Sequence, residues 1–353
     1  MKDITSKNIE TFVRLVTESE RIAIIGHMKP DGDAIGSCLG MYHYLELYGN
    51  KERKIILPHR APTYLHFLID KDTRKKVLNH EDHQAAAEKA IMESDLIICQ
   101  DFNEFHRTDT LETVLRQAKG TKILIDHHLN PDRESFSLSF SETEISSASE
   151  LVYQILMKTP VISGDASRLP AASAVALMTG MTTDTNNFSN SVFPSTLMMA
   201  SALIAAGVDR DMIITNIYQQ HHESRMRLMG HMLKDLMTIT PDGVAYAVLD
   251  RKTIQEYSID EGDTEGFVNL PLSIAKVKMS LLLKEDDNMV RVSIRSKKGV
   301  SANRCSKLHF NGGGHENAAG GRLHIPQDIE NIQEAAAYIE KHTHIFMTSE
   351  NEE

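Results

Sequence analysis

Short apolar runs alternate with helical patterns through the first half of this sequence, and this alternation constrains the fold more than any other feature. Apolar runs typical of strands cover residues 21–25, 54–57, 95–99 and 122–125. The spacing of apolar residues predicts helices over 9–16, 34–48, 83–93 and 111–118. Strands that alternate with helices usually pair in parallel and are covered on both faces. We therefore expect an α/β domain built on a parallel sheet.

The remainder of the chain changes character twice. Residues 146–237 are mostly helical in pattern, and 209–237 predicts one long helix that connects two domains. Three strand patterns and a closing helical pattern follow, at 244–249, 277–283, 289–294 and 329–341. A length of 353 residues also favours two domains over one. We predict a first domain over 1–225, a linker over 226–240 and a smaller second α/β domain over 241–345.

Composition restricts the compartment and the partners. The formal net charge of −11 argues against binding to long duplex DNA, which usually requires a basic face. No run of eighteen apolar residues predicts a membrane span, and the first residues lack the apolar stretch of a signal peptide. Cys38, Cys99 and Cys305 are far apart and read as reduced thiols. We expect a cytoplasmic protein that binds neither membrane nor long DNA but can act on small anions.

Acidic and histidine residues gather at or just after the ends of apolar segments. They are His27, Asp31 and Asp33 after the first strand, Asp101 after the third, Asp126, His127 and His128 after the fourth, and Asp184 after an apolar helical segment. Ligands bind beyond the carboxyl ends of strands in an open parallel sheet, so these side chains are expected to converge. Any one aspartate could instead cap a helix or close a turn. Their recurrence at successive strand ends favours one common site.

Carboxylate oxygens mixed with imidazole nitrogens are typical ligands of divalent metal ions. This donor set favours manganese, with iron, cobalt or magnesium as alternatives. The absence of cysteine from the clusters weighs against a structural zinc site. Four aspartates and two histidines can bind two ions if one carboxylate bridges them. Two ions about 3.5–4 Å apart can activate a hydroxide and stabilise an in-line displacement at phosphorus.

These clusters resemble, in order, the four motifs of the DHH phosphoesterase family. The resemblance is carried by GHMKPDGDAIGS from Gly26, by Asp101, by Asp126-His127-His128 and by Thr183-Asp184-Thr185. The segment NGGGHENAAGG, residues 311–321, is similar to the glycine-rich signature of the partner domain called DHHA1. The resemblance extends over about residues 20–325 and implies a two-domain enzyme with a cleft between the domains.

The resemblance implies a role for each matched residue of the first domain. One metal ion would be bound by His27 and Asp31, the other by Asp33, His127 and Asp184, with Asp101 bridging the two. Asp126 would accept a hydrogen bond from an imidazole and so orient it. His128 would lie close to the substrate phosphate or support the metal ligands. The residues that the resemblance marks as catalytic are Asp101, His128 and His315.

In the second domain, the resemblance implies substrate-binding groups. Gly312, Gly313 and Gly314 would let the backbone approach a phosphate or a base closely. His315 would face the metal ions across the cleft, and Arg295 would bind a substrate phosphate. The glycines alone could equally form a flexible loop. The nearby lysines and arginines could simply form a solvent-exposed basic face.

Departures from the family leave part of the site open. Many relatives carry a glycine where this chain has Asn186, and some carry an arginine where it has Ser189. The departures concern substrate contacts in that loop and leave the predicted metal ligands unaffected.

The resemblance is strongest to the oligoribonuclease (nano-RNase) and pAp phosphatase group of the family. Such an enzyme cleaves short oligoribonucleotides to mononucleotides and converts 3′-phosphoadenosine 5′-phosphate (pAp) to AMP. A cyclic or linear dinucleotide phosphodiesterase, acting on c-di-AMP or pApA, is the alternative within the family. A non-catalytic nucleotide-binding protein is the alternative of another class, although none of the six metal ligands is missing. Relatives also suggest a homodimer formed through the first domain.

Overall fold

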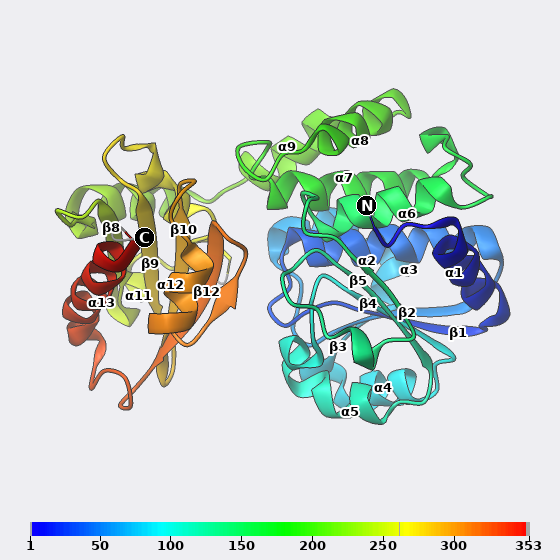
Figure 1. Cartoon of the computed structure of the whole chain (residues 1–353), viewed down its shortest axis with the longest axis horizontal. Coiled ribbons are helices and arrows are strands. Elements are labelled where there is room, and N and C mark those ends of the chain that lie inside the picture. The colour runs from blue at the N-terminus through cyan, green and yellow to red at the C-terminus, as the bar shows by residue number, and fades with distance from the viewer. Residues whose placement is uncertain (1, 261, 351–353) are drawn as a thin grey trace. The chain divides into compact units, whose positions relative to one another are not determined.

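The computed structural model describes residues 2–260 and 262–350, and the chain forms two compact units, Met1–Gln220 and His221–Glu353. Each unit contains one six-stranded sheet (Figure 1). Residues 226–240, predicted as a linker, belong to helices and a strand of the second unit, because Leu228 and Met232 are buried in one of its cores. Within the described residues, no helix combines the length and the apolar character that a membrane span requires.

The sheet of the first unit is parallel, as the sequence predicts. Its strand order is β3-β2-β1-β4-β5-β6, and every neighbouring pair of strands runs in the same direction. The strands are β1 (Arg21–Ile25), β2 (Glu52–Leu57), β3 (Val77–Asn79), β4 (Leu96–Gln100), β5 (Thr121–Asp126) and β6 (Leu138–Ser141). The order reverses between β1 and β4, which makes the crevice at their carboxyl ends the expected place for a ligand.

Helices cover both faces of this sheet (Figure 1). Successive residues of β1 alternate between the two cores, with Ile22 and Ile24 in one and Ala23 and Ile25 in the other. One face is covered by α2 (Gly32–Tyr44), α6 (Ala148–Lys158) and α7 (Ala171–Asp184), with α1 (Ser6–Glu18), α8 (Pro194–Ala205) and α9 (Arg210–Tyr218) beside them. The other face is covered by α4 (His80–Met92) and α5 (Glu112–Gln117), while α3 (Lys71–Arg74) is a single turn.

Helices α2 and α7 cross closely because glycines line their contact. A Cβ atom on Gly36 would lie 2.6 Å from the carbonyl oxygen of Ala176 and 2.8 Å from Gly180. A Cβ atom on Gly40 would lie 2.4 Å from the side chain of Leu177. The two backbones can approach this closely only where side chains are absent. The crossing therefore determines how the start of α2 lies relative to the end of α7.

The second unit has a mixed sheet of order β11-β12-β10-β9-β8-β7. Only β8 and β9 pair in parallel, and the other described pairs are antiparallel. The strands are β7 (Thr238–Ile239), β8 (Val244–Leu249), β9 (Met279–Glu285), β10 (Met289–Ser296), β11 (Gly313–Gly314) and β12 (Ala318–His324). Helices α12 (Ala302–His309) and α13 (Ala335–Glu350) pack on one core, and α10 (Glu223–His231) and the π-helical turn Met232–Leu236 on another, with α11 (Arg251–Glu256) beside it.

The single long helix predicted over 209–237 is wrong. The segment divides into α9 and α10, with non-helical residues between Tyr218 and Glu223. Helix α9 buries Ile213 and Ile217 in the first unit, whereas α10 buries Leu228 in the second. No continuous apolar stripe joins the two helices, so nothing holds the intervening residues helical.

Candidate metal centre and glycine hairpin

The loop after β1 presents His27 to two carboxylates. His27 is buried, and its Nδ1 atom lies 2.8 Å from the carbonyl oxygen of Met28, which can only accept a hydrogen bond. The neutral ring therefore directs the lone pair of Nε2 toward Asp31 Oδ1, at 3.7 Å, and Asp101 Oδ2, at 3.3 Å. A lone pair that faces two carboxylate oxygens requires a proton or a metal ion between them.

Asp31 and Asp33 are positioned by two helix N-termini. Asp31 is the N-cap of α2, where its Oδ1 accepts hydrogen bonds from the N–H groups of Asp33 (3.0 Å) and Ala34 (3.1 Å). The carboxylate of Asp33 is buried and accepts hydrogen bonds from the N–H groups of Ala148 (2.6 Å) and Ser149 (2.8 Å), the first residues of α6. The positive end of the α6 dipole stabilises this buried charge.

Asp101 lies at the centre of the cluster. It follows β4 with a left-handed backbone (φ 63°), and its N–H group donates to the carbonyl oxygen of Ile125 (3.0 Å). Such a backbone is uncommon for a residue other than glycine and is typical of constrained functional sites. Its Oδ2 faces His27 at 3.3 Å and its Oδ1 faces His127 Nε2 at 3.4 Å. One carboxylate thus reaches imidazoles from two different strand ends, as a bridging ligand must.

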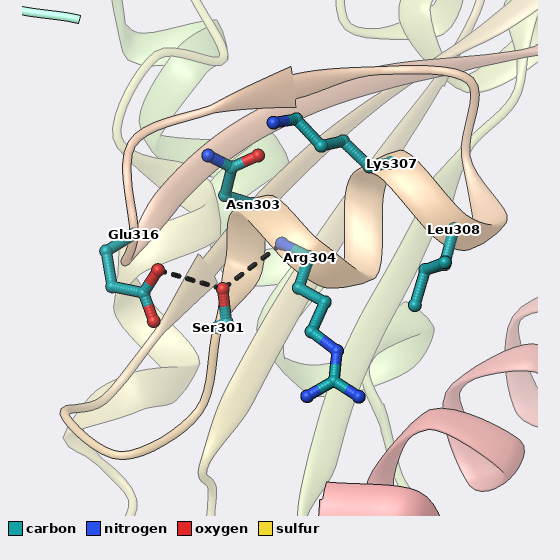
Figure 2. A pocket seen from close by; sticks show the side chains of 6 residues that line it. All are labelled: Ser301, Asn303, Arg304, Lys307, Leu308 and Glu316. Carbon is teal, nitrogen blue, oxygen red and sulfur yellow. Dashed lines mark hydrogen bonds between the residues drawn. The ribbon is translucent and has the colours of Figure 1, made fainter. Parts of the chain in front are cut away.

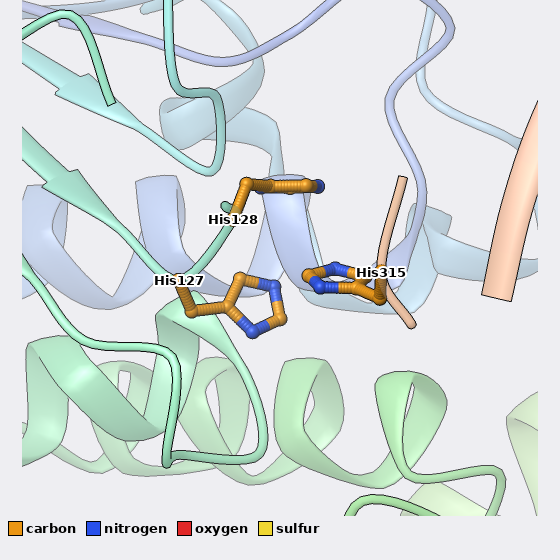
Figure 3. Close-up of side chains that lie close together, drawn as sticks. All are labelled: His127, His128 and His315. Atoms are coloured by element: carbon orange, nitrogen blue, oxygen red, sulfur yellow. The ribbon is translucent and has the colours of Figure 1, made fainter. Parts of the chain in front are cut away.

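The end of β5 supplies Asp126, His127 and His128. His127 Nε2 lies 3.8 Å from Asp33 Oδ2 and 3.7 Å from Asp184 Oδ2, in addition to its contact with Asp101. The buried carboxylate of Asp126 bonds both the N–H group and the Nδ1 atom of His128 (3.1 and 2.7 Å). The two imidazoles lie edge to face with 5.0 Å between their centres, and both project from the same strand end (Figure 3). Asp126 therefore orients His128, as the resemblance implied for one imidazole.

The electrostatics of this cluster favour cations. Burial by itself would lower the pKa of His27 and of His127, but the surrounding aspartates outweigh it and raise both pKa values to about 10. Burial and neighbouring carboxylates, against the opposing influence of His127, raise the pKa of Asp184 to about 6. Burial, with the charges of Asp101 and Asp184, raises the pKa of Asp33 well above its usual range. Without metal ions these groups would have to take up protons, so the donor set fits divalent cations.

Three groups of three side chains bring their ligand atoms within 4.8 Å of one another on this edge of the sheet. They are His27, Asp31 and Asp101; Asp33, Asp101 and His127; and Asp101, Asp126 and His128. Asp101 belongs to all three groups, and Asp184 lies beside the second. The structure thus brings together all six residues that the sequence predicts as metal ligands.

In the second unit, the predicted glycine loop is an ordered β-hairpin. Strand β11 pairs with β12, and the N–H group of His315 donates to the carbonyl oxygen of Ala318 (2.7 Å). The side-chain amide of Asn317 donates to Ser296 Oγ (3.0 Å), which ties the hairpin tip to the end of β10. A Cβ atom on Gly312 would lie 1.9 Å from the carbonyl oxygen of Gly320, so a glycine is required there. The alternative of a flexible loop is not what the structure shows.

Helix α12 and this hairpin line an open pocket of about 540 Å³ (Figure 2). Its lining residues are Ser301, Asn303, Arg304, Lys307, Leu308 and Glu316. Asn303 is nearly buried, and among the described residues its Oδ1 atom has no hydrogen-bond partner. The Cε atom of Lys307 lies only 3.6 Å from where Gly313 would carry a Cβ atom. Two of the basic residues that the sequence left as a solvated face therefore border a polar recess.

Arg295 lies at the same end of the second sheet as the hairpin. It pairs with Ala318 in the register of β10 and β12, and Ala318 also accepts the hydrogen bond of His315. Its Nη1 atom donates to the carbonyl oxygen of Ile294 (3.0 Å). Arg295, Gly312, Gly313, Gly314 and His315, all predicted to bind substrate, thus cluster within this unit.

The loop after Asp184 explains one departure from the family. Asn186, Asn187 and Phe188 all have left-handed backbones, with φ of 45°, 54° and 64°. Glycine adopts this conformation freely and asparagine tolerates it better than most residues. Asn186 in place of glycine therefore preserves the turn. The guanidinium of Arg210 lies 5.7 Å from the centre of the Phe188 ring and restrains the loop from α9.

The sequence interpretation missed the groups that hold Asp33. The N–H groups of Ala148 and Ser149 carry no side-chain signal, but the segment around them does. Ser147 caps α6 by accepting a hydrogen bond from the N–H group of Glu150 (2.9 Å), three residues later. A serine followed by glutamate at this spacing is a capping-box pattern that indicates a helix start, and helix starts are anion sites.

These two units define a two-domain family in which an acidic α/β domain precedes a glycine-hairpin domain. Residues 21–181 match the DHH family, N-terminal domain, and residues 241–341 match the DHHA1 domain. A solved structure of an exopolyphosphatase-related protein from Bacteroides fragilis is 35% identical, with a TM-score of 0.88 and 98% of each chain covered. The chain therefore belongs to the DHH family and carries a DHHA1 domain.

Characterised relatives span most of the chain at lower identity. A protein of Thermus thermophilus named bifunctional oligoribonuclease and PAP phosphatase NrnA is 29% identical and covers 89% of this chain and 88% of its own length. The protein of the same name from Bacillus subtilis is 23% identical over 91% of this chain and 95% of its own. The cyclic-di-AMP phosphodiesterase PdeA of Listeria monocytogenes is 23% identical, but only 39% of its length is covered.

Proposed function

We propose that this protein is a phosphoesterase that hydrolyses short oligoribonucleotides to mononucleotides and pAp to AMP. The observation that carries the proposal is the convergence of two imidazoles and four carboxylates at the switch point of the sheet, with Asp101 facing both imidazoles. Relatives named oligoribonuclease and PAP phosphatase align with both units over nearly their whole lengths, which supports this substrate class.

The proposed cofactor is a pair of divalent metal ions, with manganese preferred because the donor set mixes carboxylate oxygens with imidazole nitrogens. His27 and Asp31 would bind one ion, and Asp33, His127 and Asp184 the other, with Asp101 shared. When bound, such ions supply positive charge that activates water and offsets the charge developing on the phosphate. Asp101 is counted as catalytic in this proposal because it would touch both ions at the reacting centre.

The histidine beside the cluster is proposed to act on the phosphate. Asp126 holds the Nδ1 atom of His128 at 2.7 Å, so a substrate oxygen would meet the ring at Nε2. A hydrogen bond from Nε2 to a phosphoryl oxygen would become stronger as negative charge accumulates in the transition state. The Asp126 carboxylate bonds Nδ1 and so holds the ring in one orientation.

The second unit is proposed to supply the substrate-binding groups. Gly312, Gly313 and Gly314 expose backbone that can approach a phosphate or a base, and His315 and Arg295 add charged or polar contacts. The pocket on α12 offers Lys307 beside Gly313, where a phosphate oxygen could be bound. A small, partly basic recess suits a short substrate better than a long strand, which agrees with the acidic net charge of −11.

A dinucleotide phosphodiesterase is the second candidate. The alignment with the cyclic-di-AMP phosphodiesterase PdeA favours it, because 68% of this chain aligns with part of that longer protein. The third possibility is a non-catalytic nucleotide-binding protein. The presence of all six predicted metal ligands argues against it. The proposal also includes a cytoplasmic location and a homodimer. Sedimentation of the full chain would test the homodimer.

The deciding experiment compares three substrates on metal-stripped protein to which manganese is returned. We expect AMP from pAp and mononucleotides from a 5′-phosphorylated diribonucleotide, both much faster than hydrolysis of cyclic di-AMP. The matched control is Asp101→Asn, which preserves side-chain shape and removes the charge. Faster turnover of cyclic di-AMP would select the second candidate. No turnover with manganese, magnesium, cobalt or iron would overturn the proposal.

A further inference from the structure

A buried carboxylate that the metal centre does not use lies beside it on α6. Glu150 is fully buried, and its Oε2 atom accepts hydrogen bonds from the N–H and hydroxyl groups of Ser146 and from the hydroxyl of Thr196 (2.7 Å). Among the described residues, its Oε1 atom has no hydrogen-bond partner. Burying a carboxylate costs free energy unless its oxygens are fully satisfied. This glutamate therefore calls for a reason beyond packing.

Capping of α6 does not supply that reason. Ser147 already performs it, because its hydroxyl accepts the hydrogen bond from the N–H group of Glu150. The side chain of Glu150 instead reaches past the cap to Ser146 and across to Thr196, in the first turn of α8. It thereby joins the residue before α6 to a neighbouring helix and restrains the turn that begins α6.

Among the described residues, that turn supplies the two backbone N–H groups that donate to the Asp33 carboxylate. Ala148 and Ser149 follow the cap directly and donate to the two oxygens of Asp33 at 2.6 and 2.8 Å. The site leaves little room for adjustment, since a Cβ atom on Gly180 would lie 2.0 Å from Ser149 Oγ and 3.0 Å from Asp33 Oδ1. A small rotation of the turn would therefore move the carboxylate relative to His127.

We propose that Glu150 is a positioning residue that, through Ser146 and Thr196, holds the amides of Ala148 and Ser149 on Asp33 and so orients Asp33 toward a divalent cation. This inference rests on the proposed function in one respect, because it takes Asp33 as a ligand. Groups that orient ligands typically contribute about 10–100-fold to metal affinity. The effect is confined to the ion that Asp33 binds and does not extend to the one bound by His27 and Asp31.

The test measures manganese binding to the full chain by calorimetry and by metal analysis after equilibrium dialysis. Wild type is expected to bind two ions, and Asp33→Ala identifies which of them depends on Asp33. Glu150→Ala should lower the affinity for that ion about tenfold or more. The affinity for the other ion should stay within about twofold of wild type. Glu150→Gln should restore affinity to within about threefold, because the amide oxygen can accept the same hydrogen bonds. Activity is not needed for any of these readings.

The matched control is Ser173→Ala, which removes another fully buried hydroxyl of the first unit, bonded to the carbonyl oxygen of Gly40 at 2.7 Å. It should lower the melting temperature without changing affinity for either ion. Glu150→Ala that binds both ions like wild type, while Asp33→Ala loses one, would overturn the inference and leave the proposed function intact. Wild type that binds no divalent ion would instead overturn the proposed function.

Should Glu150→Ala fail to fold, Thr196→Val carries the test. It removes one of the donors to Glu150 and keeps the volume of the side chain. We expect about threefold weaker binding of the ion that depends on Asp33, with the other ion unchanged. Equal weakening of both ions, or of neither, would contradict the positioning role.

Discussion

The two units of this protein prepare their chemistry in opposite ways. In the first, charged side chains do so: six carboxylates and imidazoles, four of them buried, meet at a sheet edge, with imidazole nitrogens 3.3–3.8 Å from the neighbouring carboxylate oxygens. The second unit relies on the absence of side chains. Gly312 and Gly314 lie where any Cβ atom would collide with the neighbouring strand. One unit is arranged to bind positive ions and the other to let a backbone approach a ligand.

This difference indicates which kind of substitution should affect each unit. Charge governs the first unit, because its carboxylates repel one another until cations or protons arrive. Shape governs the second, because its hairpin has no comparable cluster of charge among the described residues. Substitutions should therefore separate into those that change metal binding and those that change substrate binding.

The largest effect is expected at the shared ligand. Asp101→Ala should reduce turnover by about 10³-fold or more, since it removes a charge that both ions would use. His127→Ala should behave in the same way. The fold should survive both substitutions, because neither side chain belongs to the hydrophobic cores on the two faces of the sheet. Turnover and bound metal measured on the same sample provide the check, and wild-type turnover with full metal occupancy would refute the assignment.

The counterpart in the second unit is His315→Ala, with an expected loss of about 10²-fold in kcat/KM. Its metal content should equal that of wild type, because His315 belongs to the hairpin and not to the acidic cluster. Steady-state kinetics and metal analysis together test this. Loss of both ions from this variant would erase the contrast between the units.

Addition of metal ions should stabilise the first unit against unfolding and have little effect on the second. Manganese at about 100 times its Kd stabilises a folded binding unit by about 2.7 kcal/mol. Hydrogen exchange should show this protection in β1, β4 and β5 and little change in β9 and β10. Asp101→Asn is the control and should abolish the protection. Uniform protection of both sheets would mean that the two units do not respond separately.

The smallest effects concern two glycines that differ only in their surroundings. Gly36→Ala should destabilise the first unit by about 1–3 kcal/mol, because the new methyl group meets the α7 backbone at 2.6 Å. Gly230→Ala should stabilise the second by about 0.5–1 kcal/mol, since nothing lies within 4 Å on this helical residue. Denaturant unfolding of both variants tests the pair. Equal effects would show that the α2–α7 crossing tolerates separation.

The sequence predicted that these acidic and histidine residues lie together, because most of them follow strands that are easily recognised. Apolar strands such as 21–25 and 122–125 are buried on both faces, and their ends lie at one edge by topology alone. Strands β3 and β6 were missed because they lie at the sheet edges and are short. Edge strands need less apolar sequence and so leave a weaker pattern.

Other features depend on contacts that no local pattern records. The register of β12 converts the glycine segment from an apparent loop into a hairpin, and pairing partners are set by tertiary structure. The spacing of Gly32, Gly36 and Gly40 was readable as a stripe on one side of a helix, but the helix that it contacts was not. The amides that hold Asp33 come from 115 and 116 residues further along the chain.

The order of strands in the first sheet has a consequence for robustness. The cluster follows β1, β4 and β5, each of which has a hydrogen-bonded neighbour on both sides, whereas β3 and β6 form the margins. Transient fraying begins at margins, where fewer contacts must break. Such fraying leaves the ends of β1, β4 and β5 in place, so the predicted ligands would stay together while the margins of the sheet open and close.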